Sequence, residues 1–219
     1  MSSQTEIARV NMIKQQLRTN DVLDDDLLRL IASIPREEFV PPEFRAFAFA
    51  DMHIPIGHDQ VMMTPVEESQ LLVAMKIRPT DTVLEIGTGT GYLTALLAKL
   101  AKHVITIDYY SEFTEAARRR LTALGIDNVQ TITGDACRGW LELAPYDVII
   151  CTGGLKRLPS IFAPQLLPQG RLFAIVGQAP VMTGERCSFD ATGHWQKSLV
   201  FETCLPLLID RSDKGDFVF

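Results

Sequence analysis

The sequence predicts an α/β fold, in which a mostly parallel, doubly wound sheet is covered by helices on both faces. From residue 66 onward, short apolar runs alternate with segments of helical periodicity, which is typical of parallel strands joined by crossover helices. A glycine-rich turn also joins the first of these strands to the helix that follows it. Ligands of such sheets bind beyond the carboxyl ends of the strands, where this turn lies.

An N-terminal helical addition is expected before the sheet. Residues 5–34 carry apolar side chains at helical spacing, and Asp21 or Asp24 can cap the second of two helices. The prolines of segment 35–42 rule out a continuous helix there. Segment 51–65 has no regular period, so we expect a long loop.

Strands and helices are then expected in alternation, ending in one or two strands over 196–209. The segment 167–170 (Leu-Pro-Gln-Gly) indicates a turn. The other expected elements, in chain order, are helix 66–77, strand 82–86, helix 91–101, strand 103–107, helix 111–124, strand 128–132, strand 146–151, a short helix near 158–166 and strand 171–176.

The chain has 219 residues, which fits one α/β domain with an N-terminal addition. We therefore divide it into an N-terminal helical cap with a substrate-side loop, residues 1–65, and a ligand-binding sheet domain, residues 66–219. These two parts are expected to form one compact unit, because 47% of the residues are apolar and can build a sizeable core.

Charge and cysteine content limit the partners and the compartment. The net charge of −6 gives no electrostatic reason to expect nucleic acid or an anionic membrane as a partner. No apolar run is long enough to span a membrane. The four cysteines are scattered, which favours reduced thiols and a cytoplasmic location. The histidines show no metal-ligand spacing, and no metal site is expected. The sequence does not indicate the oligomeric state.

The strongest motif is the segment Val83–Tyr92, VLEIGTGTGY, which predicts strand, tight turn and helix. A dinucleotide fingerprint, G-x-G-x-x-G, would need its third glycine at position 92. Here that glycine comes one residue early, at Gly91, and Glu85 precedes the turn. A carboxylate at this place would repel a pyrophosphate, but it could hold the ammonium group of an amino acid. The motif therefore favours S-adenosylmethionine over a nicotinamide dinucleotide.

Two further acids follow the next two strands. Asp108 can accept hydrogen bonds from two ribose hydroxyls, and Asp135 can accept one from the adenine amino group. Tyr109 or Tyr110 could stack on the adenine. Asp108 or Ser111 could instead cap the following helix, and Asp135 could be a turn residue. The expected cofactor-binding residues are Glu85, Gly87, Thr88, Gly89, Gly91, Asp108, Tyr109, Asp135 and Ala136.

Several further segments stand out beside Val83–Tyr92: Ile34–Pro41 (IPREEFVP), Ala50–Asp51, Ile54–His58 (IPIGH), Ala144–Ile150 (APYDVII) and Leu166–Leu172 (LLPQGRL). Through these segments the chain resembles the protein-L-isoaspartate O-methyltransferases over residues 9–208. The methyltransferase motifs of that resemblance indicate only a bound methyl donor, whereas its N-terminal pieces are specific to the family.

The resemblance implies a Rossmann-like methyltransferase fold with additional N- and C-terminal elements. It implies S-adenosylmethionine as cofactor, S-adenosylhomocysteine as product, and damaged aspartyl residues of a protein or peptide as acceptor. In the family an isoaspartyl carboxylate attacks the methyl group and becomes a methyl ester. A carboxylate of pKa about 4 is ionised at neutral pH, so no general base is required.

The chain departs from the family in the acceptor-side loop. The family loop reads Gly-His-Gly-Gln-Thr-Ile-Ser-x-Pro, and its Thr and Ser fall on Val61 and Met63 here. Met63 cannot donate a hydrogen bond to a substrate carboxylate. Thr64 could supply a hydroxyl if the loop shifts, and His58 or Gln60 could contribute a donor. The candidate catalytic residues are therefore Met63, Thr64, His58 and Gln60.

These substitutions leave alternatives open. The chain could methylate a different acceptor, or it could bind the cofactor without turnover as a sensor or recognition module. A nicotinamide-dependent reductase is disfavoured by the early Gly91 and by Glu85.

Overall fold

The computed structural model describes residues 3–189 and 195–210. Helix α1 (Ser3–Asn11) continues as a π-helical segment to residue 17, and α2 (Asp25–Ser33) follows after a short 3-10 turn. The carboxylate of Asp24 accepts hydrogen bonds from the Asp26 and Leu27 N–H groups, so Asp24 rather than Asp21 caps α2. The prolines that follow permit only two 3-10 helices, Arg36–Glu38 and Pro42–Phe47.

The expectation of a long loop over 51–65 was wrong, because the segment contains a β-hairpin. Strands β1 (Ile54–Gly57) and β2 (Gln60–Met62) pair in antiparallel fashion. His58 and Asp59 form the turn at φ angles of 53° and 54°, which Asn-Gly pairs usually occupy. With three- and four-residue strands and no usual turn signal, the sequence held no visible hairpin pattern.

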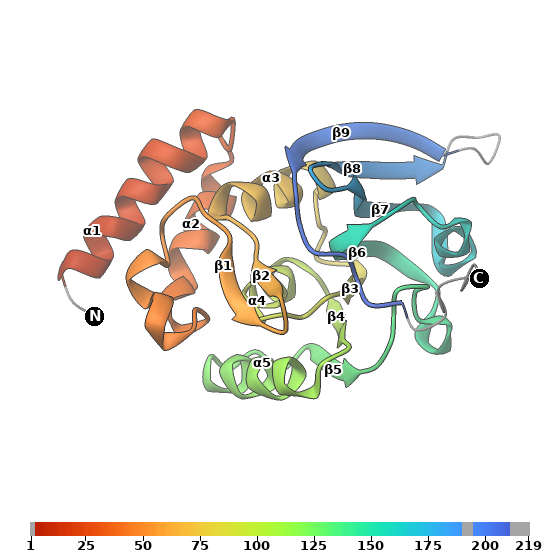
Figure 1. Ribbon diagram of the computed structural model, residues 1–219, viewed down its shortest axis with the longest axis horizontal. Coiled ribbons are helices and arrows are strands. Elements are labelled where there is room, and N and C mark those ends of the chain that lie inside the picture. Colours follow the sequence, from red (N-terminus) through yellow and green to blue (C-terminus); the bar gives the residue numbers. More distant parts are fainter. Residues whose placement is uncertain (1–2, 190–194, 211–219) are drawn as a thin grey trace, which may run out of the picture.

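Seven strands form the central sheet, in the spatial order β5-β4-β3-β6-β7-β8-β9 (Figure 1). The pairs from β5 to β7 are parallel, whereas β8 and β9 add antiparallel strands at one edge. The strands are β3 (Thr82–Ile86), β4 (His103–Asp108), β5 (Val129–Thr133), β6 (Tyr146–Leu155), β7 (Leu166–Gln178), β8 (Val181–Phe189) and β9 (Trp195–Thr203).

The mostly parallel α/β sheet was predicted correctly, and strands β3 to β6 begin within one residue of their predicted starts. The C-terminal part differs. The predicted turn at 167–170 lies inside β7, as an irregularity where Gln169 has a φ of 64°. Strand β8 had not been predicted at all. It pairs along most of its length with β7 and β9, so these long-range partners determine its conformation more than its own sequence does.

Helices α3 (Pro65–Met75), α4 (Tyr92–Leu100) and α5 (Ser111–Ala123) pack on one face of the sheet. Successive residues of a strand point to opposite faces, so Val83 joins the cluster beneath these helices and Leu84 joins the other. The second face carries the 3-10 helices Leu141–Leu143 and Ser160–Gln165, and the second of these is the short helix expected near 158–166.

The N-terminal part packs onto the same core as the sheet. Figure 1 shows α1 and α2 beside the sheet, with the β1–β2 hairpin between them and the strands. One hydrophobic cluster extends from Met12 and Phe39 in the N-terminal part to Phe173 in the sheet. This packing brings the hairpin close to the carboxyl ends of the parallel strands.

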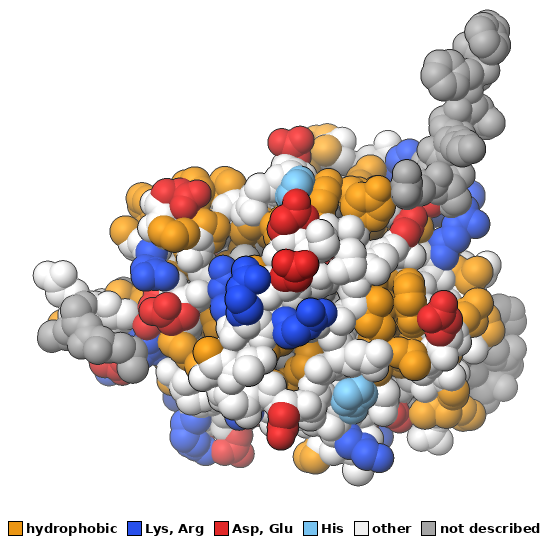
Figure 2. All heavy atoms as spheres, turned by 90° about the horizontal axis from the view of Figure 1, so that it is seen from below, with side chains coloured by type: hydrophobic (Ala, Val, Ile, Leu, Met, Phe, Trp, Pro, Cys, Tyr) orange, Lys and Arg blue, Asp and Glu red, His pale blue; other side chains and the backbone are white. Residues whose placement is uncertain are grey.

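Figure 2 shows the face that carries α5, on which acidic and basic side chains lie among each other. Two of the three consecutive arginines of α5 have structural partners: Arg118 donates to Thr131, and Arg120 donates to the Thr90 carbonyl. No helix in the described part of the chain is long and apolar enough to cross a membrane.

Gly91 begins α4 at a φ of 86°, and a Cβ there would lie 2.7 Å from the Ala117 Cβ. We expect Gly91→Ala to destabilise the protein by about 2–4 kcal/mol, because backbone strain and a steric clash add. Urea unfolding measures the change.

The control is Gly125→Ala. Gly125 also has a positive φ, of 65°, but a Cβ added there would meet no atom within 4 Å. We expect this variant to lose only about 1 kcal/mol. Equal losses in both variants would show that the close approach of α4 to α5 contributes nothing.

Candidate functional site

One cavity, of about 830 Å³ up to its open mouth, lies at the carboxyl ends of β3, β4 and β5. The chain order of the sheet reverses beside β3, which makes this the usual ligand position in a doubly wound sheet. The glycine-rich loop after β3 forms one wall. The hairpin, the start of α3 and the C-terminal residues Leu208 and Ile209 contribute the others. The hairpin, the sheet and the last described residues therefore meet at one site.

The glycine loop is held against the end of β6. The Thr152 hydroxyl contacts the carbonyls of Ile86 and Gly87, at 3.0 and 2.7 Å. Gly87 has a φ of 100°, and a Cβ there would lie 2.3 Å from the same hydroxyl oxygen. A side chain at this position would displace Thr152, so the cavity requires glycine.

Glu85 is fully buried on β3 and lines the cavity. The hydroxyls of Thr94 and Thr106 donate to its Oε2 at 2.5 and 2.6 Å. Its Oε1 is buried without a hydrogen-bond partner. Burial raises the pKa of Glu85 to about 8, against the lowering by these two hydroxyls. A buried oxygen without a partner is costly, so a cationic group in the cavity would satisfy Glu85.

Asp108 ends β4 and holds the glycine loop from the other side. Its two oxygens accept hydrogen bonds from the N–H groups of Gly89 and Tyr110, at 2.9 and 3.0 Å. Burial raises its pKa, against the lowering by these backbone donors. The N-cap residue of α5 is Tyr110, and its side chain makes no capping hydrogen bond. Neither Asp108 nor Ser111 therefore caps that helix by accepting from the backbone N–H of its second or third residue.

The third expected acid, Asp135, lies after β5 and is exposed at the cavity wall. It accepts a hydrogen bond from the Cys137 N–H at 3.2 Å. Ala136 beside it is buried, and Tyr109 lines the same wall. The acids that follow three successive strands thus reach a single cavity, as the sequence predicts.

Asp135 and Cys137 also lie near Asp210, with one potential metal-ligand atom from each within 4.8 Å of the others. Burial raises the pKa of Cys137 to about 12.

The hairpin supplies the wall opposite the glycine loop. Gln60, Val61 and Met63 line the cavity, and Met63 is almost completely buried. His58, at the hairpin tip, instead stacks on Tyr110 with ring centroids 3.8 Å apart. Thr64 is the N-cap of α3: its hydroxyl accepts from the Glu67 N–H in a capping box. The cavity wall contains neither His58 nor Thr64.

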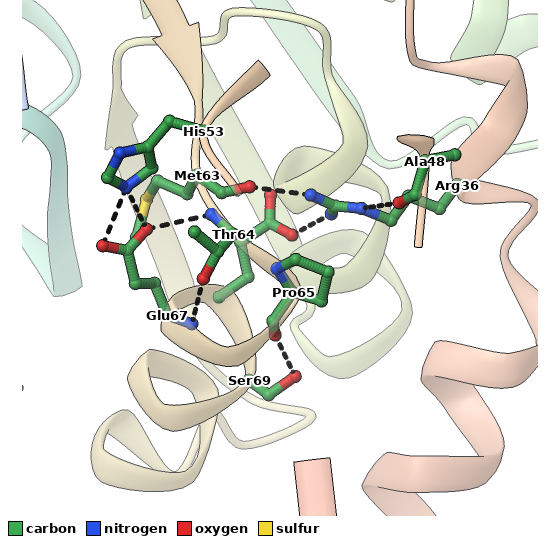
Figure 3. A network of polar contacts seen from close by, with 9 residues as sticks. Arg36, Ala48, His53, Met63, Thr64, Pro65, Glu67 and Ser69 are labelled. Carbon is green, nitrogen blue, oxygen red and sulfur yellow. Dashed lines mark hydrogen bonds and ion pairs between the residues drawn. The ribbon is translucent and has the colours of Figure 1, made fainter. Parts of the chain in front are cut away.

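Figure 3 shows the polar contacts beneath the hairpin, where the Arg36 side chain is buried. Its guanidinium donates to the carbonyls of Ala48 (2.9 Å) and Met63 (2.7 Å) and to the carboxylate of Glu68. Its Cζ also lies 4.6 Å from the centre of the Tyr92 ring. Arg36 therefore connects the N-terminal part, the hairpin, α3 and α4.

A second contact holds the same turn. His53 lies 2.9 Å from Glu67 Oε2, and the Thr64 N–H donates to that oxygen. The Thr203 hydroxyl on β9 donates to the other oxygen of Glu67. Hydrogen bonding to Glu67 raises the pKa of His53. No role of His53 was predicted from the sequence, and its contacts here are structural.

The cavity brings together most of the predicted site residues, with His58, Thr64 and Gly91 outside its wall. Sequence reasoning missed Glu68 and Leu208, which also line it. Glu68 lies in the first turn of α3, where acids are common because they favour the helix dipole. No local pattern therefore distinguished it.

The model of the protein-L-isoaspartate(D-aspartate) O-methyltransferase family matches residues 8–193. The chain belongs to this family. A protein-L-isoaspartate O-methyltransferase of Koribacter versatilis is 41% identical over 169 residues, or 77% of this chain and 76% of the relative. One of Gloeobacter violaceus is 38% identical over 166 residues, or 76% of this chain and 81% of the relative.

Solved structures share the fold of this family member. A protein-L-isoaspartate O-methyltransferase aligns with a TM-score of 0.77 at 24% identity, covering 91% of this chain and 65% of the other. A Plasmodium falciparum structure, described as a putative enzyme of the same kind in complex with S-adenosyl-L-homocysteine, aligns with a TM-score of 0.75 at 19% identity. That alignment covers 93% of this chain and 97% of the other.

The environment of Glu85 predicts that donor binding releases a proton. With a pKa raised to about 8, chiefly by burial and also by Asp108 and Glu68, Glu85 is mostly neutral at pH 6.5. A cation at Oε1 favours the ionised form, so the affinity for S-adenosylmethionine should rise with pH up to about 8, by up to about tenfold per unit.

Calorimetry of donor binding at pH 6.5, in two buffers with different ionisation enthalpies, counts the protons released. We expect the native protein to release close to one proton more than Glu85→Gln. An equal number of released protons for the two proteins would contradict the assignment of Glu85.

Proposed function

We propose that the protein transfers a methyl group from S-adenosylmethionine to the carboxylate of isoaspartyl residues in damaged proteins. One observation carries the proposal: the cofactor-type glycine loop and the family-specific hairpin line the same cavity. Family membership supports both the cofactor and the acceptor.

The donor half of the site consists of the acids after β3, β4 and β5. Glu85 offers its buried, unpartnered Oε1 to the ammonium group. Asp108 keeps lone pairs for the ribose hydroxyls while the Gly89 and Tyr110 N–H groups hold it in place. Asp135, with Tyr109 and Ala136 beside it, suits the adenine. S-adenosylmethionine supplies an electrophilic methyl group on a sulfonium that becomes a neutral thioether.

The residues of the acceptor half orient the substrate rather than activate it. The isoaspartyl carboxylate is already ionised at neutral pH. An O–C bond forms as the C–S bond breaks, and no proton needs to move. Catalysis then depends on holding oxygen, carbon and sulfur in line. The buried, apolar Met62 and Met63 side chains exclude water from this part of the cavity.

Gln60 is the best-placed candidate to replace the missing hydroxyl donors. Its amide nitrogen makes one long hydrogen bond, 3.4 Å to the His58 carbonyl, and its side chain lines the cavity. The Met63 side chain contributes only an apolar part of the cavity wall. Its backbone carbonyl already accepts a hydrogen bond from Arg36. If Thr64 donated to the acceptor, it would have to do so while its hydroxyl caps α3. If His58 donated, it would have to do so while its ring stacks on Tyr110.

We place this activity in the cytoplasm. The cysteines Cys137, Cys151, Cys187 and Cys204 are all unpaired, which suits a reducing compartment. The acceptor is a protein or peptide, in line with the family, and neither nucleic acid nor a membrane is required.

The test is methyl transfer from labelled S-adenosylmethionine to an isoaspartyl peptide, beside its aspartyl twin. We expect base-labile label on the isoaspartyl peptide alone. Calorimetry with the donor accompanies the assay. Donor binding without transfer to the isoaspartyl peptide would overturn the proposed acceptor, and absence of donor binding would overturn the cofactor assignment.

For Gln60→Ala, we expect kcat/KM on the isoaspartyl peptide to fall about 10- to 100-fold. The loss of one hydrogen bond to a carboxylate corresponds to about 1.5–3 kcal/mol. Donor affinity should stay within twofold of the native value. Gln70→Ala is the control, because Gln70 lies on α3 outside this cavity. An unchanged kcat/KM for Gln60→Ala would exclude the amide as the replacement donor.

A further inference from the structure

The ionisable side chains of the cavity wall have one sign of charge. Glu68, Glu85, Asp108 and Asp135 line it, and within the described residues no Lys, Arg or His does. S-adenosylmethionine carries two positive groups, an ammonium and a sulfonium. Glu85 can neutralise one of them through its unpartnered oxygen. The second positive group needs its own partner.

Glu68 has the geometry for that partner. Its side chain is only 5% exposed, and Arg36 holds its Oε2. Its Oε1 makes no hydrogen bond to any residue that the structure describes, although the side chain lines the cavity. In this ion pair, the Arg36 guanidinium lies beneath the hairpin and binds one oxygen of Glu68. The other carboxylate oxygen of Glu68 is available to a ligand.

Arg36 also fixes the position of Glu68 relative to the acceptor half of the site. The same guanidinium binds Glu68 and the Met63 carbonyl, and both residues line the cavity, so the carboxylate and Met63 form adjacent parts of one wall. Arg36 itself is committed to three acceptors and to the Tyr92 ring. It cannot turn toward a substrate without leaving a buried charge unpaired.

The charge of Glu68 acts on Glu85. Burial is the main cause of the raised pKa of both carboxyl groups, Glu68 to about 7 and Glu85 to about 8, and the charge of Glu68 adds to the shift of Glu85. Two desolvated acids near each other are unfavourable when the cavity is empty. The two cationic groups of S-adenosylmethionine, whose carboxylate makes its net charge +1, can each neutralise one of these acids.

We propose that Glu68 is a cofactor-binding residue that faces the sulfonium of S-adenosylmethionine, while Glu85 faces the ammonium. The methyl group must point from the donor half toward the acceptor half, and Glu68 lies at the junction between them beside Met63. This inference rests on the donor lying in the cavity, as the proposed function requires.

A carboxylate at the sulfonium distinguishes the donor from the product. Methyl transfer converts the sulfonium to a neutral thioether, so the attraction to Glu68 is lost while the ammonium contact with Glu85 remains. Glu68 thereby favours binding of the donor relative to S-adenosylhomocysteine, and it favours product release after transfer.

The test is calorimetric binding of S-adenosylmethionine and of S-adenosylhomocysteine to the native protein and to Glu68→Gln. Glutamine keeps the size of the side chain and can still accept from Arg36. We expect the affinity for S-adenosylmethionine to fall about tenfold and that for S-adenosylhomocysteine to change less than threefold. Equal losses for both ligands, or no loss for either, would overturn the assignment.

Glu67→Gln is the matched control. Glu67 precedes Glu68 on the same turn of α3, binds His53, Thr64 and Thr203, and does not line the cavity. We expect it to lower thermal stability without changing the ratio of the two affinities. A shift of that ratio equal to the one in Glu68→Gln would mean that disturbance of α3, rather than the charge of Glu68, causes the effect.

If Glu68→Gln fails to fold, Glu68→Asp keeps the charge and withdraws it by one methylene. The same selective loss for S-adenosylmethionine is expected, at about threefold, and an unchanged ratio overturns the proposal. Native protein that binds neither ligand would refute the cofactor assignment itself. Binding of both ligands without transfer to an isoaspartyl peptide would refute only the acceptor.

Discussion

The buried guanidinium of Arg36 is the interaction on which the arrangement of the site depends. It binds the Ala48 and Met63 carbonyls and the Glu68 carboxylate, and it packs on the Tyr92 ring. A buried charge is tolerated only when its donors are satisfied, and removing one partner of such a pair typically costs about 3–5 kcal/mol. The N-terminal part, the hairpin and two helices are therefore held in one relative position, which defines the wall opposite the glycine loop.

The parallel sheet provides the rest of the frame. Because β3, β4 and β5 run in the same direction, the residues that follow them meet at one edge. Glycine at positions 87 and 91 lets the loop lie against Thr152 and lets α4 lie against α5. The Asp108 carboxylate then fixes the loop through the Gly89 N–H. The same acid thus shapes the cavity and remains available to a ligand.

The cavity combines acids that follow β3, β4 and β5 with an apolar wall from the hairpin. Burial raises the pKa of Glu85, Glu68 and Asp108, so the empty site holds carboxyl groups that a cationic ligand can ionise. Val61 and Met63 leave few hydrogen-bond donors near the acceptor, which makes the orientation of Gln60 important. The contrast between the two halves follows from the charge of the donor and from the chemistry of an acceptor that is already ionised.

The sequence by itself predicted the fold class, the strands from β3 to β6 and the three acids that line the cavity. Each of these signals is local: an apolar run predicts a strand, and Glu85, Asp108 and Asp135 each follow from the position of their own strand. Only the tertiary structure decided the β1–β2 hairpin, strand β8 and the contacts that Arg36 and Glu68 make. These depend on partners far away in the chain, such as the contact between Arg36 and Glu68. No local periodicity records such contacts, because they exist only once the N-terminal part has packed against the sheet.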